Sequence, residues 1–136
     1  MNKSYAFALR AIKLYKYLIY EKKEYVLSKQ LLRSGTSIGA LIKEGEHAQS
    51  KPDFLNKMNV ALKEANEAEY WIELLRDSEY LTAAESLSIL EDASELIRLL
   101  ASIVKSTKTS LLKIKSERWS KHQTFSIFNF HFSIKV

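Results

Sequence analysis

The sequence has no cysteine, one proline and only three glycines among its 136 residues. The lack of cysteine excludes thiol nucleophiles, thiolate zinc sites, iron–sulfur clusters and disulfide scaffolds. The scarcity of proline and glycine argues against a sheet with many turns. No apolar run approaches the roughly 18 to 20 residues of a spanning helix, and residues 1–4 carry no secretory signal pattern. We therefore expect a cytoplasmic protein.

Hydrophobic residues make up 46% of the chain and charged residues 27%, which is typical of one soluble globular domain. Apolar spacing predicts helices throughout residues 4–117. In the third predicted helix, apolar residues recur every three or four positions and form a single stripe. The stripe comprises Phe54, Met58, Ala61, Ala65, Ala68, Ile72 and Leu75. Ser50 is its predicted N-cap, with Asp53 three residues later and Pro52 in the first turn.

The fourth predicted helix opens with Thr82 and Glu85, which have the spacing of a capping box. Its apolar stripe comprises Leu90, Ala93, Ile97, Leu100, Val104, Thr107, Leu111 and Ile114. The connection at residues 78–81 is short, so the third and fourth helices must be antiparallel neighbours.

The first predicted helix, residues 4–23, is apolar around more than half of its circumference, which is wider than one core contact requires. We therefore predict an oligomer interface on it, formed by Phe7, Leu14, Tyr17 and Leu18. The second predicted helix, residues 26–49, carries Gly35 and Gly39, each costing roughly 1 kcal/mol relative to alanine. Close approach of a neighbouring helix would compensate for these glycines, and a local break of the helix around residues 34–39 is the alternative.

Together these patterns predict an all-α fold, an antiparallel up-down-up-down four-helix bundle in residues 1–117 with a non-helical tail in residues 118–136. Alternating apolar and polar residues near the end of the tail are typical of a strand, and strand addition between subunits is one interpretation. A low-complexity appendage, extended or disordered, is the preferred one, because Phe125-Ser126-Ile127 recurs seven residues later.

The net charge of +5 is unevenly distributed: residues 1–51 carry +6, residues 52–101 carry −7 and residues 102–136 carry +6. A basic face that attracts polyanions is one consequence, and neutralisation between helices or subunits is the alternative. The candidate phosphate-binding residues on two helix faces are Arg10, Lys13 and Lys16 on the first helix and Lys105, Lys108 and Lys115 on the fourth.

Catalytic and metal-binding patterns are scarce. Glu44 and His47 give one Glu-x-x-His spacing, and a di-iron bundle needs two. No phosphate-binding glycine loop, nucleophile elbow or hydrolase constellation is present. We therefore expect no enzymatic activity, no metal and no cofactor.

Two stretches carry a family resemblance. Residues 30–45 read QLLRSGTSIGALIKEG and residues 54–71 read FLNKMNVALKEANEAEYW. Their order and spacing resemble the bacterial four-helix-bundle family first known from open reading frames in the intervening sequences of 23S ribosomal RNA genes. Arg33, Ser37, Glu44 and Gly45 match the family pattern, whereas many members have asparagine in place of Leu41.

The resemblance implies a bundle that assembles as a homopentamer. A related bundle, the accessory variability determinant protein of diversity-generating retroelements, binds nucleic acid and a reverse transcriptase, so RNA, DNA or a reverse transcriptase are the implied partners. Arg33 joins the candidate nucleic-acid-binding residues on this basis, with helix packing as its alternative role. Two hypotheses follow: an oligomeric nucleic-acid-binding accessory protein, or a protein-interaction scaffold indifferent to nucleic acid.

Overall fold

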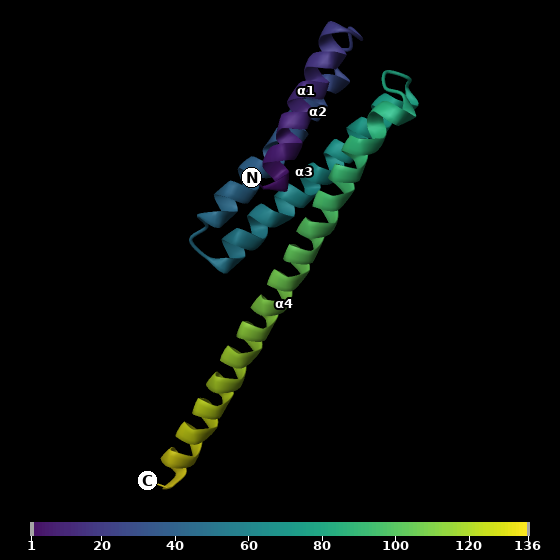
Figure 1. Ribbon diagram of the computed structural model, residues 1–136. Helices are drawn as coiled ribbons and strands as arrows, with labels where there is room; N and C mark the ends of the chain where they lie inside the picture. Colours follow the sequence, from purple (N-terminus) through teal and green to yellow (C-terminus); the bar gives the residue numbers. More distant parts are fainter. Residues whose placement is uncertain (1, 136) are drawn as a thin grey trace.

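A computed structural model describes the backbone of residues 2–135 and the side chains of residues 2–123. The chain forms four helices, α1 (Lys3–Tyr20), α2 (Leu27–Glu46), α3 (Lys51–Asp77) and α4 (Ala83–Lys135), and the described backbone contains no strand. Consecutive helices run in opposite directions, and α4 continues well beyond the other three (Figure 1). The predicted all-α four-helix bundle is confirmed.

The predicted helix starts are confirmed in detail. The Ser50 hydroxyl accepts a hydrogen bond from the Asp53 N–H at 3.2 Å and caps α3. At α4, Thr82 and Glu85 exchange reciprocal bonds of 2.9 and 3.1 Å, the arrangement of a capping box. The Thr82 N–H and the Tyr17 hydroxyl, both donating to the Glu85 carboxylate, lower its pKa.

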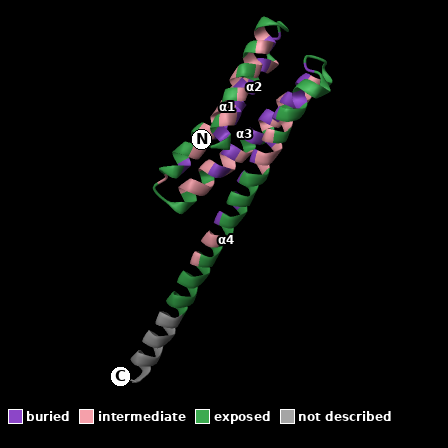
Figure 2. Cartoon of the chain, viewed as in Figure 1, coloured by how far each residue is buried: buried purple, intermediate pink, exposed green. Residues whose placement is uncertain are grey.

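The core follows the sequence stripes closely, as the buried stretches in Figure 2 show. On α3, six of the seven predicted residues are buried and Phe54 packs half-buried against them. On α4 the most deeply buried row is shifted by one position over the first turns, to Ile89 and Leu96 instead of Leu90 and Ile97. Ala93 and Leu100 belong to both rows and are buried as predicted.

The glycines of α2 lie against neighbouring helices, and α2 is continuous from Leu27 to Glu46. A Cβ atom added at Gly35 would lie 2.7 Å from the Cβ of Ala11 on α1. At Gly45 it would lie 2.5 Å from the Cε of Met58 on α3. At Gly39 an added Cβ would lie 3.3 Å from the Ser4 hydroxyl oxygen on α1. Close approach of α1 therefore compensates for Gly35 and Gly39, and the alternative of a local break is wrong.

The start of α2 depends on a residue that the sequence patterns did not reveal. The nearly buried Glu24 carboxylate accepts hydrogen bonds from the N–H groups of Val26, Leu27 and Ser28 at 2.7 to 3.1 Å. The Ser28 hydroxyl returns a bond to the Glu24 carbonyl at 2.8 Å. Burial alone would raise the pKa of Glu24, but these backbone donors outweigh it and the pKa is lowered.

Replacing Glu24 by Ala is expected to lower the free energy of unfolding by about 2 kcal/mol, because three N–H groups at the start of a helix lose their acceptor. The pKa of Glu24 in the folded protein lies below the ordinary value of 4.5. The carboxylate therefore contributes its full share of the free energy of unfolding above pH 4.5, and this share is lost as the pH falls through the folded pKa. Urea unfolding at about pH 7 and about pH 3.5 checks this. An unchanged difference between wild type and Glu24→Gln at the two pH values would contradict the assignment.

The end of the chain differs from the sequence prediction. The backbone of α4 remains helical to Lys135, where an alternating pattern predicted a non-helical tail from residue 118. A lone strand would leave its backbone N–H and C=O groups without a partner, whereas a helix satisfies them within the segment. The side chains of residues 124–136, including the repeated Phe-Ser-Ile triplet, lie outside the described side chains. The division between a bundle at 1–117 and an appendage at 118–136 stays a prediction.

Candidate nucleic-acid interface

The predicted cationic strip on α1 is partly neutralised by α4. Arg10 donates to Asp92 at 2.5 Å, Lys3 pairs with Glu95, and the Tyr17 hydroxyl donates to Glu85 at 2.8 Å. These three contacts form a polar seam along the two helices. Lys13 and Lys16 remain exposed, so only two of the three predicted α1 cations are unpaired among the described side chains.

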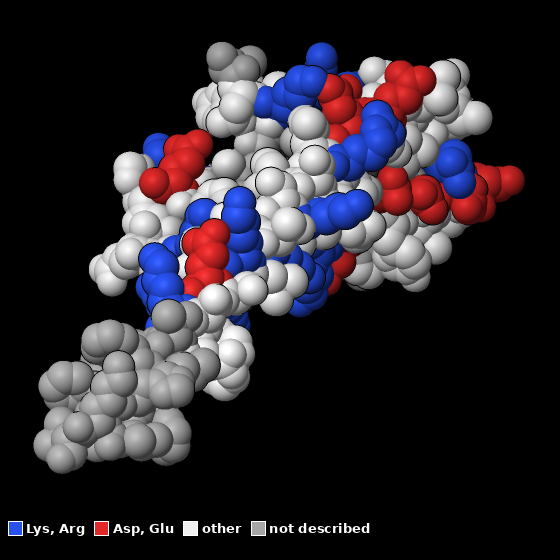
Figure 3. All heavy atoms as spheres, turned by 90° about the horizontal axis from the view of Figure 1, so that it is seen from below, with Lys and Arg blue, Asp and Glu red and all other residues white. Residues whose placement is uncertain are grey.

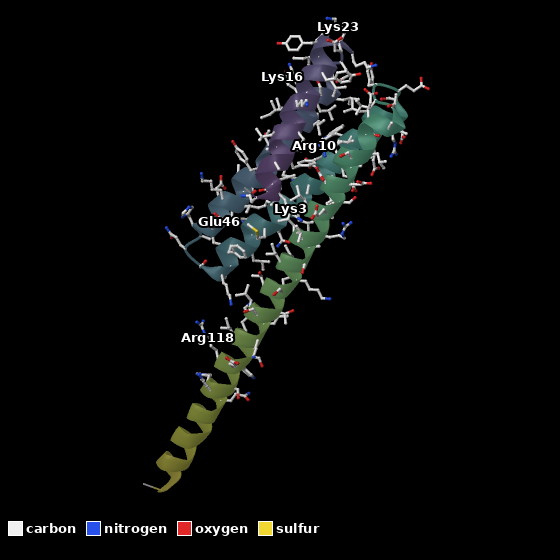
Figure 4. The ribbon with its side chains drawn as sticks, in the orientation of Figure 1. Lys3, Arg10, Lys16, Lys23, Glu46 and Arg118 are labelled. Atoms are coloured by element: carbon white, nitrogen blue, oxygen red, sulfur yellow. The ribbon has the colours of Figure 1, made fainter. Side chains whose placement is uncertain are left out.

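The two predicted strips do not form one patch on a subunit. Tyr17 lies at the level of Glu85, and Lys105 lies 20 residues further along α4, which is about 30 Å at the rise of an α-helix. Figure 4 shows the same separation between Lys16 on α1 and Arg118 far down α4. The cations of α1 and α4 therefore cannot contact the same few phosphates from one subunit.

Arg33 serves the contact between α2 and α3. Its guanidinium bonds Glu67 at 2.7 Å and both carboxylate oxygens of Glu64 at 3.3 and 3.4 Å. The bond to Glu67 and the charge of Glu64 raise the pKa of Arg33. Glu64 is nearly buried, so Arg33 supplies the charge that keeps it satisfied. Arg33 therefore takes part in helix packing, its alternative role, and its contact with nucleic acid stays a prediction.

Exposed cations follow one another along the last part of α4, beginning where α4 packs against the first turns of α3. Lys105, Lys108, Lys113, Lys115, Arg118 and Lys121 are all exposed. None of the six forms an ion pair with any side chain in residues 2–123. Figure 3 shows Lys and Arg side chains clustered where the described surface meets the end of the chain, with some acidic surface among them. We call these six residues the α4 cationic segment.

One further cation lies beside this segment. Lys51, at the start of α3, donates to the Ser110 hydroxyl at 2.6 Å. Lys51 therefore lies beside α4 at a level between Lys108 and Lys113. Sequence reasoning missed Lys51, Lys113, Arg118 and Lys121 as candidate residues. The charge of residues 102–136 was the available signal for three of them, whereas only the fold places Lys51 here.

The net charge also differs between the first 102 residues and the rest of the chain. Residues 1–102 contain 14 Lys and Arg against 15 Asp and Glu, a net charge of −1. Residues 103–136 contain seven against one, a net charge of +6. Residues 1–102 are thus almost neutral, and the net positive charge of the protein resides in residues 103–136.

The predicted oligomer interface is corrected for Phe7 and Leu18 and stays a prediction for Leu14 and Tyr17. Phe7 and Leu18 are 1% and 0% exposed within the subunit's own core, so they are not available to a second subunit. Leu14 and Tyr17 are half-buried against the same core. The wide apolar face of α1 is nevertheless real, because its other side, with Tyr5, is exposed.

That exposed side forms a groove of about 610 Å³ between α1 and α2. Tyr5, Ala8, Leu9 and Ile12 line it from α1, and Thr36, Gly39 and Ala40 line it from α2. A second hollow, of about 400 Å³, lies between α1 and α4 beside Lys13 and Glu85. The first groove offers apolar side chains without any partner in the described chain.

The residues that match the family pattern lie mainly where α2 meets α3. Glu44 pairs with Lys57 at 3.4 Å, and Gly45 packs on Met58. Ser37 donates to the Ser34 carbonyl within α2 at 2.9 Å, and Leu41 packs half-buried against the core. The two matching stretches therefore lie on the two helices of one contact.

No group of three or more His, Cys, Asp or Glu side chains that could hold a metal ion occurs in residues 2–123. His47, which forms the single Glu-x-x-His spacing with Glu44, is the exposed C-cap of α2. None of the described helices combines the length and apolar character needed to cross a membrane.

The fold defines a small four-helix-bundle protein whose last helix carries a cationic extension. The chain belongs to the family of 23S rRNA-intervening sequence proteins, which matches residues 1–102. It is similar to a solved protein of unknown function from the S23 ribosomal protein family of Bacteroides thetaiotaomicron, with 59% identity and a TM-score of 0.75. That match covers 76% of this chain and 95% of the other. No curated protein matches the chain.

Proposed function

We propose that this protein is a non-enzymatic accessory factor that binds RNA or DNA through the α4 cationic segment. The observation that carries the proposal is the segregation of charge, −1 in residues 1–102 and +6 in residues 103–136. Exposed Lys and Arg side chains without acidic partners suit phosphate contacts that do not depend on base sequence. These side chains lie where α4 passes the start of α3 and extends beyond it, so a partner can reach them away from most acidic residues of the bundle (Figure 1).

We further propose that the subunits assemble as a homo-oligomer, a pentamer by analogy with the family, through the groove between α1 and α2. Apolar side chains such as Leu9, 47% exposed, support this role because burying them against a second copy removes them from water. An oligomer would present several α4 segments together, which raises affinity through multivalency. A reverse transcriptase remains the proposed protein partner by the same analogy.

The groove also supports the second candidate, a protein-interaction scaffold with no role in nucleic-acid binding. Both candidates require an oligomer or a protein partner at this groove, so assembly alone does not separate them. Their difference lies in the α4 cationic segment, which contributes to function only in the first.

Light scattering of the purified protein, combined with fluorescence anisotropy of a labelled RNA hairpin with a long loop, tests the proposal. With four phosphate contacts and the single-strand slope, we expect affinity to fall about 50-fold between 50 and 200 mM salt. A mass of several subunits that increases with RNA supports the accessory role. An oligomer that gains no RNA mass at either salt concentration would leave the scaffold, and a monomer would contradict the assembly.

A further inference from the structure

The α4 cationic segment has a face on which cationic and apolar side chains alternate. Lys108, Leu112, Lys115, Trp119 and His122 follow one another at intervals of four, three, four and three residues. This spacing places them in one row along a helix. All five are exposed, Leu112 by 67% and Trp119 by 63%. We call these five residues the α4 row.

The α4 row is not an extension of the core. The side of α4 that packs on α3 carries Leu100, Val104 and Thr107, which are buried, and the half-buried Leu111 and Ile114. Leu112 and Trp119 lie on a different side, and no described residue covers them. Trp119 therefore exposes a large aromatic surface next to Lys115, one helical turn away, where water is an unfavourable neighbour.

We infer that the α4 row binds single-stranded nucleic acid, with Trp119 stacking on a base and Lys108 and Lys115 contacting the phosphates on either side. This inference rests on the proposed function. Aromatic side chains stack on bases of any sequence, because every base has a π-face, and cations beside them follow the backbone. In a duplex the base faces are covered by their neighbours, so an indole gains little there.

The dimensions of the α4 row agree with this ligand. Its 14-residue separation from first to last side chain corresponds to about 21 Å along the helix. A stacked strand advances about 3.4 Å per nucleotide, so the row matches about six nucleotides.

An anionic membrane surface is the other polyanion that attracts lysine and tryptophan together. A helix that lies on a membrane buries a continuous apolar face. The α4 row instead interrupts its two apolar side chains with Lys115 and ends in His122, so cations would have to enter the same layer as the indole. The alternating cationic and apolar side chains favour a single nucleic-acid strand over a membrane, because the phosphates and bases of a strand also alternate.

Replacing Trp119 by Leu tests the stacking contact, because leucine keeps an apolar side chain but has no π-face. We expect affinity for a 12-nucleotide single strand, RNA or DNA, to fall about tenfold, while affinity for a duplex of the same length stays unchanged. Trp119→Phe should keep most of the single-strand affinity. Tyr20→Leu is the matched control, because Tyr20 is a 67% exposed aromatic on α1 and should have no effect.

Fluorescence gives an independent measurement. The sequence has two tryptophans, and the Nε1 of Trp71 is buried without a hydrogen-bond partner, so Trp71→Phe breaks no hydrogen bond and leaves Trp119 as the only indole. Single strands should quench its emission and duplexes should not.

Each outcome separates this inference from the proposed function. If Trp119→Leu binds single strands like wild type, while replacing the lysines abolishes binding, the stacking inference is overturned and the proposed function stands. If wild type binds neither strands nor duplexes, both are overturned. If the Trp119 emission shifts to the blue with vesicles of anionic phospholipid and ignores single strands, the α4 row is a membrane-binding surface and the inference is wrong.

Discussion

Reversing the charge of Lys105, Lys108, Lys113 and Lys115 with glutamate is expected to lower affinity for RNA on the order of 100-fold at low salt. The four side chains are exposed and have no ion-pair partner in residues 2–123, so the change removes phosphate contacts without breaking contacts inside the subunit. Lysine and glutamate have similar helix propensities, so α4 should remain helical. Anisotropy titrations across a salt series measure the affinity, and the salt dependence should become shallower as well.

A matched control separates the place of the charge from its amount. Glutamate at Lys13, Lys16, Lys29 and Lys63 changes the net charge by the same amount, and these side chains are also exposed, on α1, α2 and α3. We expect this variant to bind RNA within a few-fold of wild type, because distant charges act only through a screened field. If both variants lose binding equally, net charge alone governs the affinity and the α4 cationic segment is not the interface.

The core was predictable from sequence because residues spaced three or four positions apart lie on the same face of a helix. Ala61, Ala65 and Ala68 needed only the 3.6-residue repeat to be assigned to the core, and all three are fully buried. The period alone could not choose between the two adjacent apolar rows at the start of α4. Which row is buried depends on how α1 and α3 surround that helix, and this is a property of the assembled bundle.

The positive charge of the candidate site was predictable from sequence, but the side chains that each cation contacts were not. The ion pairs of Arg33 could not be predicted, because its partners Glu64 and Glu67 lie 31 and 34 residues away, on the next helix. Arg10 likewise meets Asp92 only through the fold. Lys105, Lys108 and Lys115 were identified correctly as exposed cations because few acidic residues follow residue 101 in the chain.

Replacing Gly35 by Val is expected to destabilise the bundle by about 3 kcal/mol, the upper end of the range for overpacking. Even the first added atom would lie 2.7 Å from the Cβ of Ala11, with Phe7 also in contact at 3.6 Å. Ala11 has no flexible end that can move aside, so α1 and α2 must separate. Urea unfolding followed by circular dichroism, at a fixed subunit concentration because assembly shifts apparent stability, measures the loss.

Two further variants identify the helix contact as the cause. At Gly39 an added Cβ would meet the Ser4 hydroxyl at 3.3 Å, so Gly39→Ala should change stability by less than about 1 kcal/mol, since better helix propensity offsets the tight contact. Combining Gly35→Val with Ala11→Gly removes the opposing methyl group and should recover about 1 kcal/mol relative to the sum of the single changes. Strictly additive losses would mean that the cost of valine arises within α2 itself. The close approach of α1 would then not be the reason for glycine at this position.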